Sequence, residues 1–338
     1  MLYLKTTELD AAHHFAVEEY LLQQGNLNQP LLMLWQTVPT VMLGQYQLAD
    51  AELDHQRAAE QDISIVRRPS GGGAIFTDAG TLLISLIIPS SIQQQGQQQA
   101  AREQFAELLT GALNQLGIPA QLQGRNDILV DGKKVSGMAQ FARKQGVCTH
   151  GSLLFDADLE LLARVLKVDD EKFRTKAVKS IRSRVTNVKE YAASQSLPLG
   201  DYDTAEFAQA LTGALLKTDA AEQCHLSEDD RDKVRQIYQE KYGNPDWVRT
   251  KTPKFSMHAA KRFPAGKLEI FLDVSKGLVT SCAIHGDFLG TVPVAELEQR
   301  ITGMPYLREE FAQALESVDN SSVLGGISAE EFLSCVFD

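Results

Sequence analysis

Residues 67–76 read Arg67-Arg68-Pro69-Ser70-Gly71-Gly72-Gly73-Ala74-Ile75-Phe76, which places three consecutive glycines after a pair of arginines. Segments 63–67 and 74–76 are predicted strands, so the glycines are predicted to lie in the loop between them. Because glycine has no Cβ, the backbone N–H groups of such a loop can approach a ligand closely. Successive N–H groups form a concavity that binds anions, and Arg68 can add a bidentate contact to a phosphate. The alternative is a flexible turn beside a surface arginine pair. The stretch lacks both the P-loop and the dinucleotide-binding patterns.

A second stretch, residues 124–137, reads Gly124-Arg125-Asn126-Asp127-Ile128-Leu129-Val130-Asp131-Gly132-Lys133-Lys134-Val135-Ser136-Gly137. Asp131-Gly132 predicts a two-residue hairpin turn, which brings Asp127 and the two lysines onto neighbouring strands. Successive strand residues point to opposite faces, so only one lysine can face a given side. Alternation alone leaves the choice open, because Val135 shares a face with Lys133 and Met138 shares one with Lys134.

This hairpin suits phosphate chemistry. A buried lysine beside a phosphate stabilises the charge that develops when a phosphoanhydride breaks. Asp127 with Asn126 is a candidate site for Mg²⁺, which prefers one or two carboxylates together with phosphate oxygens. The alternative is an exposed hairpin with a solvated tip, and we favour that interpretation for Lys133.

Length and charge limit the classes of function. With 338 residues the chain is long enough for two domains, and its formal charge of −11 argues against a nucleic-acid or anionic-membrane partner. We expect no signal peptide at the N-terminus and no apolar run long enough to cross a bilayer. The four cysteines show no CxxC or zinc spacing, which favours free thiols and a cytoplasmic location.

The apolar pattern mixes helices with strands that pair through hairpins, which predicts an α+β fold rather than a doubly wound parallel sheet. Asn244-Pro245-Asp246 marks the predicted domain boundary. In the first predicted helix, 9–22, we expect Glu18-Glu19 to lie on the solvent-exposed surface and His13-His14 to be half-buried. The expected helices are 9–22, 50–61, 102–116, 158–165, 204–216, 227–242, 297–301, 308–317 and 329–336. The expected strands are 31–35, 40–43, 63–67, 74–76, 81–88, 127–130, 134–141, 151–155, 268–274 and 277–285.

Together with two further blocks, these stretches resemble bacterial lipoate–protein ligase A, of the biotin/lipoate A/B protein ligase family. The further blocks are His150-Gly151-Ser152-Leu153-Leu154 and Ser180-Ile181-Arg182-Ser183-Arg184-Val185-Thr186-Asn187-Val188. All four occur in the family's order. Phe15 to Tyr20 and Leu34 to Gln45 match its first helix and first strand pair, and the tail beyond Asn244 resembles its accessory domain.

The resemblance implies a catalytic domain similar to biotin ligases and class II aminoacyl-tRNA synthetases, followed by a small α+β C-terminal domain. The implied domains are 1–243 (catalytic), 244–252 (hinge) and 253–338 (accessory), with movement about the hinge when the adenylate forms. The implied reaction uses ATP and Mg²⁺ to convert lipoate to lipoyl-AMP with release of pyrophosphate. The lipoyl group then passes to a lysine of an acceptor protein.

The resemblance also assigns residues. Lys134 is implied to be the catalytic lysine, and Asp127 the Mg²⁺ or adenylate contact. The segment from Lys172 to Arg184 is implied to close over the adenylate. The implied nucleotide contacts are Arg68, Gly73, Ala74, Ile75, Phe76, Asp127, Lys134 and Arg182. The implied acyl-substrate contacts are Ser70, Gly71, Gly72, Lys134, Ser136, Gly137, His150 and Gly151.

The implied acceptors are lipoyl domains of 2-oxoacid dehydrogenase E2 subunits or the glycine-cleavage H protein, and the implied small substrate is lipoate or octanoate. We expect a monomer by default.

Two alternatives remain open, and the first rests on a departure from the family pattern. The chain has Thr77 and Thr81 where the family usually has His and Asn, which keeps open a lipoate-binding protein without turnover. Related enzymes transfer octanoyl or lipoyl groups between carrier proteins without ATP, through a cysteine thioester. Their nucleophile occupies the position of Asn126-Asp127, so Cys148 is predicted to be an inert strand residue.

Overall fold

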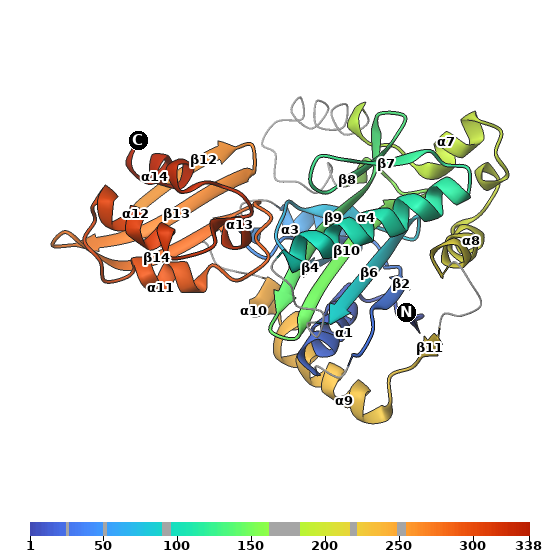
Figure 1. Cartoon of the computed structure of the whole chain (residues 1–338), viewed down its shortest axis with the longest axis horizontal. Coiled ribbons are helices and arrows are strands. Elements are labelled where there is room, and N and C mark those ends of the chain that lie inside the picture. Colours follow the sequence, from blue (N-terminus) through green and yellow to red (C-terminus); the bar gives the residue numbers. More distant parts are fainter. Residues whose placement is uncertain (25–26, 50–52, 90–95, 162–182, 217–221, 249–254) are drawn as a thin grey trace. The chain divides into compact units, whose positions relative to one another are not determined.

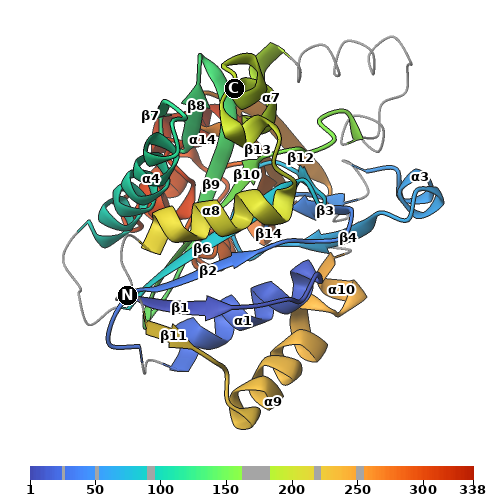
Figure 2. The same ribbon diagram turned by 90° about the vertical axis from the view of Figure 1, so that its right-hand side faces the viewer.

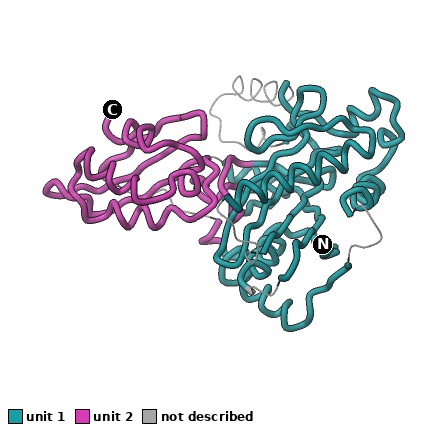
Figure 3. The backbone as a smooth tube through the Cα atoms, in the orientation of Figure 1, with its two compact units in different colours: residues 1–42, 53–66, 75–244 teal, residues 43–52, 67–74, 245–338 magenta. Residues whose placement is uncertain are grey.

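The computed structural model describes residues 1–24, 27–49, 53–89, 96–161, 183–216, 222–248 and 255–338. The chain divides into two compact units (Figure 3). Unit 1 comprises residues 1–42, 53–66 and 75–244, and unit 2 comprises residues 43–52, 67–74 and 245–338. Among the described residues, none of the helices combines the length and apolarity that a bilayer crossing requires.

Unit 1 is built on an eight-stranded sheet with the order β11-β1-β2-β6-β10-β9-β8-β7 (Figure 1). Strand β1 runs parallel to β2 and β11, and the remaining neighbours are antiparallel. Central strand β6 is buried along its whole length, as its run of Leu and Ile predicts. The strands are β1 (Leu2–Lys5), β2 (Leu31–Trp35), β6 (Thr81–Pro89), β7 (Ala120–Gln123), β8 (Asp127–Val130), β9 (Lys133–Arg143), β10 (Gly146–Leu154) and β11 (Glu222–Cys224).

Helices cover both faces of this sheet (Figure 2). α4 (Gln97–Gln115) and α8 (Thr204–Leu216) pack on one face and enclose the main hydrophobic core of the unit. α1 (Ala11–Gln24) packs on the other face, and α9 (Glu228–Ile237) packs against α1. Unit 1 also holds α3 (His55–Glu60), α7 (Val188–Ser194), the 3-10 turn η2 (Pro198–Gly200) and the π-helical turn η3 (Tyr238–Tyr242).

A smaller three-stranded sheet has the order β4-β3-β5, with bounds β3 (Thr40–Leu43), β4 (Ser64–Arg67) and β5 (Ile75–Thr77). Its strands belong mainly to unit 1, and the loop that joins β4 to β5 belongs to unit 2. This loop contains the three consecutive glycines, Gly71 to Gly73.

The C-terminal part of unit 2 packs helices against a hairpin-connected sheet with the order β12-β13-β14. Lys276 (φ 50°) and Gly277 (φ 77°) form the turn between β13 and β14, and two successive positive φ angles suit a tight hairpin. The elements are α10 (Pro245–Val248), β12 (Met257–Phe263), β13 (Gly266–Ser275), β14 (Leu278–Gly286), α11 (Ala295–Ile301), α12 (Arg308–Glu316), α13 (Asn320–Val323) and α14 (Ala329–Phe337).

The predicted α+β fold class is confirmed, and several predicted boundaries are wrong. α4 begins at Gln97 within the glutamine-rich segment, and the last turn of the predicted helix 227–242 is a π-helix. Four short strands, β1, β7, β11 and β12, have no counterpart in the prediction. Residues 162–165 of the predicted helix 158–165 lie outside the described residues.

Candidate active site

Lys134 and Asp127 form an ion pair on the β8–β9 hairpin, with 2.7 Å between Nζ and Oδ1. Asp131 (φ 49°) and Gly132 (φ 74°) form the tight turn of this hairpin, as the sequence predicts. The side chains of Lys134 and Asp127 are 35% and 38% exposed, so both remain accessible to a ligand.

A β-bulge puts Lys134 on the same face of the sheet as Gly137. Ile128 pairs with Ser136 and the next residue, Leu129, pairs with Lys134, so Val135 is an extra residue in β9. Beyond the bulge, Gly137 pairs with Asp127. Strict alternation would put Lys134 and Gly137 on opposite faces, and the extra residue puts them on the same one. Lys133, before the bulge, is exposed.

Gly137 gives the side chain of Lys134 its path across the sheet. A Cβ built on Gly137 would lie 2.7 Å from Lys134 Nζ and 2.8 Å from its Cε, closer than atoms approach. Any other residue at position 137 would therefore displace the lysine.

Ser136 points to the other face, where its strand partner Ile128 belongs to the main core. Its hydroxyl is buried and has no hydrogen-bond partner among the described residues. A substrate contact from Ser136 would have to come from its backbone.

The later part of the fourth sequence block lies against the same lysine. The N–H of Thr186 donates to the carbonyl of Lys134 at 3.0 Å, and Val185 forms a parallel bridge with Lys134. Arg182 lies outside the described residues, as does most of the predicted adenylate-covering segment from Lys172 to Arg184.

Small residues continue the face of Lys134 across strands β9 and β10. Gly137 pairs with Ser152, and Ala139 pairs with His150, so these four residues share the face. Gly137, Ala139 and Ser152 are partly exposed although they lie in central strands, whereas His150 is buried. Small, partly exposed side chains thus line this face between Lys134 and the imidazole.

Gly151 faces the opposite side. A Cβ at this position would meet the ring of Phe105 in α4 at 2.8 Å. Gly151 therefore lets α4 pack closely against the sheet. It lies on the face opposite Lys134.

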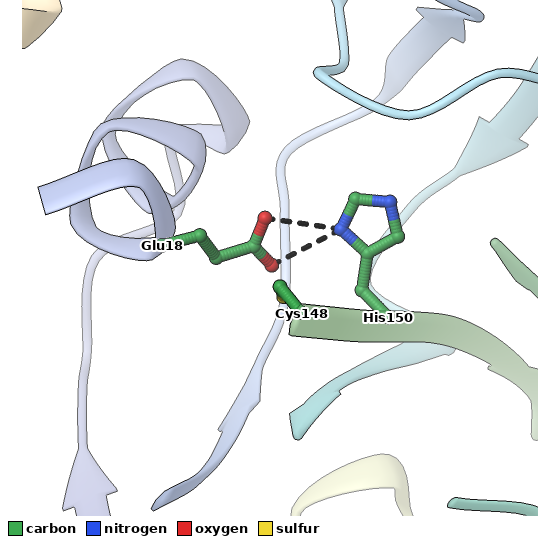
Figure 4. Close-up of side chains that lie close together, drawn as sticks. All are labelled: Glu18, Cys148 and His150. Carbon is green, nitrogen blue, oxygen red and sulfur yellow. Dashed lines mark hydrogen bonds and ion pairs between the residues drawn. The ribbon is translucent and has the colours of Figure 1, made fainter. Parts of the chain in front are cut away.

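The prediction that Glu18 and Glu19 lie on an exposed helix surface is wrong, because both side chains are buried in unit 1. Glu18 accepts hydrogen bonds from His150 Nδ1 at 3.0 and 3.2 Å (Figure 4). It also accepts one from Ser85 Oγ at 2.6 Å. Ser85 Oγ in turn accepts from Trp35 Nε1 at 2.9 Å. A residue on α1 therefore fixes the orientation of the predicted substrate contact His150.

Glu19 is the centre of a charge network. Arg143 and Lys241 contact its carboxylate at 3.0 and 2.7 Å, and the hydroxyl of Tyr242 donates to it. Burial alone would raise the pKa of Glu19, but the two cations lower it to about 2. The network joins α1, β9 and the π-helical turn.

His14 is also more buried than predicted. Its side chain is fully enclosed and packs against the tilted ring of Trp35, with 4.3 Å between ring centroids. Its Nε2 contacts the carbonyl of Glu8 at 2.9 Å. Burial lowers the pKa of His14 to about 4, so the ring is neutral at neutral pH.

In unit 2, Arg67 anchors the glycine-rich loop. Its side chain is buried, and burial lowers its pKa to about 10. Trp247 Nε1 also donates to the Arg67 carbonyl at 2.9 Å. The guanidinium of Arg67 donates hydrogen bonds of 2.6–3.0 Å to the backbone carbonyls of Gly44, Gln45, Gln47, Trp247 and Val248.

Arg68 holds the loop from within. Its Nη2 donates to the carbonyls of Gly71 and Gly73 at 2.8 and 2.7 Å. Burial, reinforced by repulsion from Arg67, lowers its pKa to about 10, so the buried arginine stays positively charged. A buried cation inside a glycine loop is suited to an anion.

Two glycines of this loop are required, Gly71 by a close backbone contact and Gly72 by its left-handed backbone conformation. A Cβ on Gly71 would lie 2.3 Å from the carbonyl oxygen of Phe288, and the N–H of Gly72 (φ +95°) donates to the same oxygen at 3.0 Å. Ser70 is buried, Gly73 is exposed, and Ala74 and Ile75 are half-buried. Phe76 is buried in β5 of unit 1.

The two departures from the family pattern are hydrogen-bonded locally. Thr77 is fully buried, and its hydroxyl lies 2.7 Å from that of Thr37. Thr81 donates to Asp78 at 3.2 Å, in a turn where Asp78 also accepts from the N–H of Gly80. Both threonines have a structural partner.

Cys148 is fully buried, and burial together with Glu18 raises the pKa of its thiol well above the usual value. Such a thiol is protonated at neutral pH and is a poor nucleophile. This agrees with the prediction of an inert strand residue.

Comparison with known proteins places these features in a family. Residues 10–216 match the lipoyl protein ligase A/B catalytic domain, and residues 252–336 match the bacterial lipoate protein ligase C-terminus. The lipoate-protein ligase LplJ of Bacillus subtilis is 36% identical over 331 residues, which cover 97% of both chains.

Two solved structures share the fold. P. falciparum LipL1 in complex with lipoate has a TM-score of 0.76 at 23% identity and covers 94% of both chains. A bi-partite lipoate protein ligase of Thermoplasma acidophilum, described with its E2 lipoyl domain, has a TM-score of 0.65 at 26% identity. That match covers 76% of this chain and 98% of the other. The two family matches and the full-length similarity show that this chain belongs to the lipoate-protein ligase family of enzymes.

Proposed function

We propose that the chain is an ATP-dependent lipoate-protein ligase. It joins lipoate to AMP with release of pyrophosphate and then transfers the lipoyl group from AMP to a lysine amine of an acceptor protein. The observation that carries this proposal is the accessible Lys134–Asp127 pair, which the bulge at Val135 places on the same face of the sheet as Gly137.

Lys134 supplies the positive charge of the reaction. An ammonium fixed at the end of an otherwise neutral strip of small residues would bind the carboxylate of the acyl substrate. The same charge would stabilise the negative charge that develops on the reacting phosphate. Asp127 holds Lys134 in place until these anions arrive.

The strip from Gly137 to His150 is proposed to receive the acyl chain. Its side chains carry no charge before the imidazole, so the apolar part of lipoate would lose little by leaving water there. Gly137, Ser152 and Ala139 are partly exposed along this face. His150, held by Glu18, would lie toward the far end of the chain.

The residues present fit Mg²⁺ at Asp127. Within the part of the chain that the structure describes, Asp127 belongs to no group of three potential metal ligands. A single carboxylate suits Mg²⁺ that is held mainly by phosphate oxygens, where the ion would neutralise phosphate charge. Asp127 would then exchange its ion pair with Lys134 for the metal.

The nucleotide is proposed to bind through Arg68, Gly73 to Phe76 and Arg182, as the sequence resemblance implies. The buried, positively charged guanidinium of Arg68 supports an anion-binding role. Ser70 to Gly72 are proposed to border the acyl group.

The proposed acceptors are lipoyl domains of 2-oxoacid dehydrogenase E2 subunits and the glycine-cleavage H protein. The match to the Thermoplasma acidophilum ligase, which is described with an E2 lipoyl domain, supports the first class. The attacking lysine must be neutral, although its ordinary pKa is about 10.4. Loss of water around the docked lysine would lower that value.

We further propose a monomeric, cytoplasmic enzyme with domains at 1–243 and 253–338 and a hinge at 244–252. The boundary between the units at 244 and 245 supports a hinge there, although part of unit 2 comes from earlier in the chain. Residues 249–254 lie outside the described residues. Matching small-angle scattering profiles with and without ATP and lipoate would contradict a hinge movement.

The test is a reconstituted reaction of full-length protein with ATP, Mg²⁺, lipoate and a purified lipoyl domain. We expect lipoate-dependent release of pyrophosphate and a lipoyl mass increase on the acceptor. Lipoylation that proceeds from an acyl-carrier donor without ATP would favour the transferase instead. Binding of lipoate without release of pyrophosphate and without lipoylation of the acceptor would favour a lipoate-binding protein without turnover.

A further inference from the structure

The cluster of Glu18, Cys148 and His150 in unit 1 contains the donor atoms of a metal site. One carboxylate oxygen, one sulfur and one imidazole nitrogen lie within 4.8 Å of one another, and all three side chains are buried (Figure 4). We propose that this cluster binds a thiophilic divalent cation, with Zn²⁺ as the principal ion.

The backbone places the three ligands on two rigid elements. Cys148 and His150 are two residues apart on β10 and therefore point to the same face of the sheet. Glu18 comes from the middle of α1, which packs on that face. Ligands on a helix and a central strand are held more firmly than ligands on loops.

The spacing suits a tetrahedral ion. His150 Nδ1 lies 3.0 Å from Glu18 Oε2, and two ligands on one Zn²⁺ lie about 3.3 Å apart, given bonds of about 2.0 to 2.1 Å. The hydrogen bond between imidazole and carboxylate would be replaced by two metal bonds with little movement. The three donor atoms lie within 4.8 Å of one another, and binding would draw the more distant of them together.

The ligand types select the metal. Thiolate and imidazole favour Zn²⁺ and Co²⁺ over Mg²⁺, which prefers oxygen ligands. Burial and the Glu18 carboxylate raise the pKa of the Cys148 thiol, and a divalent cation reverses that effect because it stabilises the thiolate. A carboxylate and a thiolate together would neutralise the charge of the ion, which matters in a buried site.

A second layer of hydrogen bonds already orients one ligand. Ser85 Oγ donates to Glu18 Oε1 at 2.6 Å and is itself fixed by the indole N–H of Trp35 at 2.9 Å. Bonds of this kind raise metal affinity because they fix the ligand before the ion arrives. Three protein ligands leave a fourth position for water or another small ligand.

The experiment is a titration of the reduced, chelator-dialysed full-length protein with Co²⁺. We expect a near-ultraviolet sulfur-to-cobalt absorption band that saturates at one equivalent and disappears when Zn²⁺ is added. Cys148→Ala should abolish the band, and Glu18→Gln, which has the same shape, should weaken binding at least about tenfold. Cys335→Ala is the matched control, because it removes a buried cysteine outside the cluster.

A band absent from the wild-type protein would overturn the proposal, and so would a band that survives Cys148→Ala and thus reports an adventitious ion. Thermal unfolding supplies a second readout that guards against variants that fail to fold. Zn²⁺ should raise the Tm of the wild-type protein and leave the Tm of Cys148→Ser unchanged. Equal Tm shifts in the two proteins would also contradict the site. The measurement needs neither ATP nor lipoate, so it stands or fails separately from the proposed function.

Discussion

The β8–β9 hairpin and the glycine-rich loop both carry predicted site residues, but they are held in place by different means. On the hairpin, a two-residue turn and a one-residue bulge set the direction of Lys134 within a few positions of the chain. The loop depends on residues far away in the sequence, since Arg67 is bound to carbonyls as many as 181 positions along the chain. Hairpin variants should therefore change chemistry and leave stability nearly intact, whereas loop variants should change both.

The largest expected effect belongs to Lys134→Ala. Removal of its ammonium should lower lipoate-dependent pyrophosphate release at least about 10²-fold, the usual loss for one electrostatic contact to a transition state. The thermal midpoint should stay close to that of the wild type, because the ion pair with Asp127 is partly exposed. Steady-state kinetics and thermal unfolding of the same protein preparation measure both.

Lys133→Ala is the matched control, since it removes the same group one position before Lys134. It should retain wild-type activity. A comparable loss in both variants would show that the bulge does not single out Lys134.

Arg67→Met is the corresponding change in the loop. It leaves the five backbone carbonyls without their donor, which should cost about 3 kcal/mol of unfolding free energy, because each unsatisfied buried acceptor costs roughly 1–3 kcal/mol before relaxation. Chemical denaturation followed by circular dichroism measures the change. Arg57→Met, at a half-exposed arginine in α3, is the control and should cost less than about 1 kcal/mol.

Glu19 predicts a pH dependence for unit 1. Its pKa of about 2 lies below the ordinary 4.5, so the folded state prefers the ionised form. The resulting stability is present above pH 4.5 and is lost as the pH falls toward 2, and it is on the order of 3 kcal/mol. Glu19→Gln should lower stability at pH 7 and flatten its decline between pH 4.5 and 2. Urea denaturation at each pH measures the unfolding free energies of the two proteins. An equal decline of both between pH 4.5 and 2 would contradict the role of the Glu19 network.

The smallest expected effect belongs to Thr77→Val. It removes one buried hydroxyl contact, with Thr37, and should destabilise the protein by about 1 kcal/mol with little change in kcat. A drop in kcat of tenfold or more, measured with stability intact, would instead place Thr77 in the chemistry of the site.

The sequence allows the hairpin turn, the buried central strand and the α+β class to be predicted, because turn residues and apolar runs are local signals. It does not show the bulge, since an extra residue leaves no mark in the alternation of Lys133, Lys134 and Val135. The family resemblance points to Lys134 rather than Lys133. The structure supplies a physical reason, because the bulge places Lys134 on the same face as Gly137.

The buried carboxylates show a different limit. Glu18 and Glu19 read as a helix surface because their partners, His150 and Arg143, lie more than 120 residues away. An acidic residue among apolar neighbours at helical spacing was the available signal, but a buried partner cannot be identified without the fold. The same holds for Arg67, whose acceptors are backbone atoms that carry no sequence signature.

The most direct test of the proposed chemistry is the lipoate-dependent exchange of radiolabelled pyrophosphate into ATP, without any acceptor protein. This exchange isolates adenylate formation, because it requires the reversible joining of lipoate to AMP and no transfer. We predict exchange in the wild type that depends on lipoate and Mg²⁺ and is lost in Lys134→Ala. Lipoylation of an acceptor without any such exchange, or exchange that persists in Lys134→Ala, would contradict adenylate formation at this lysine.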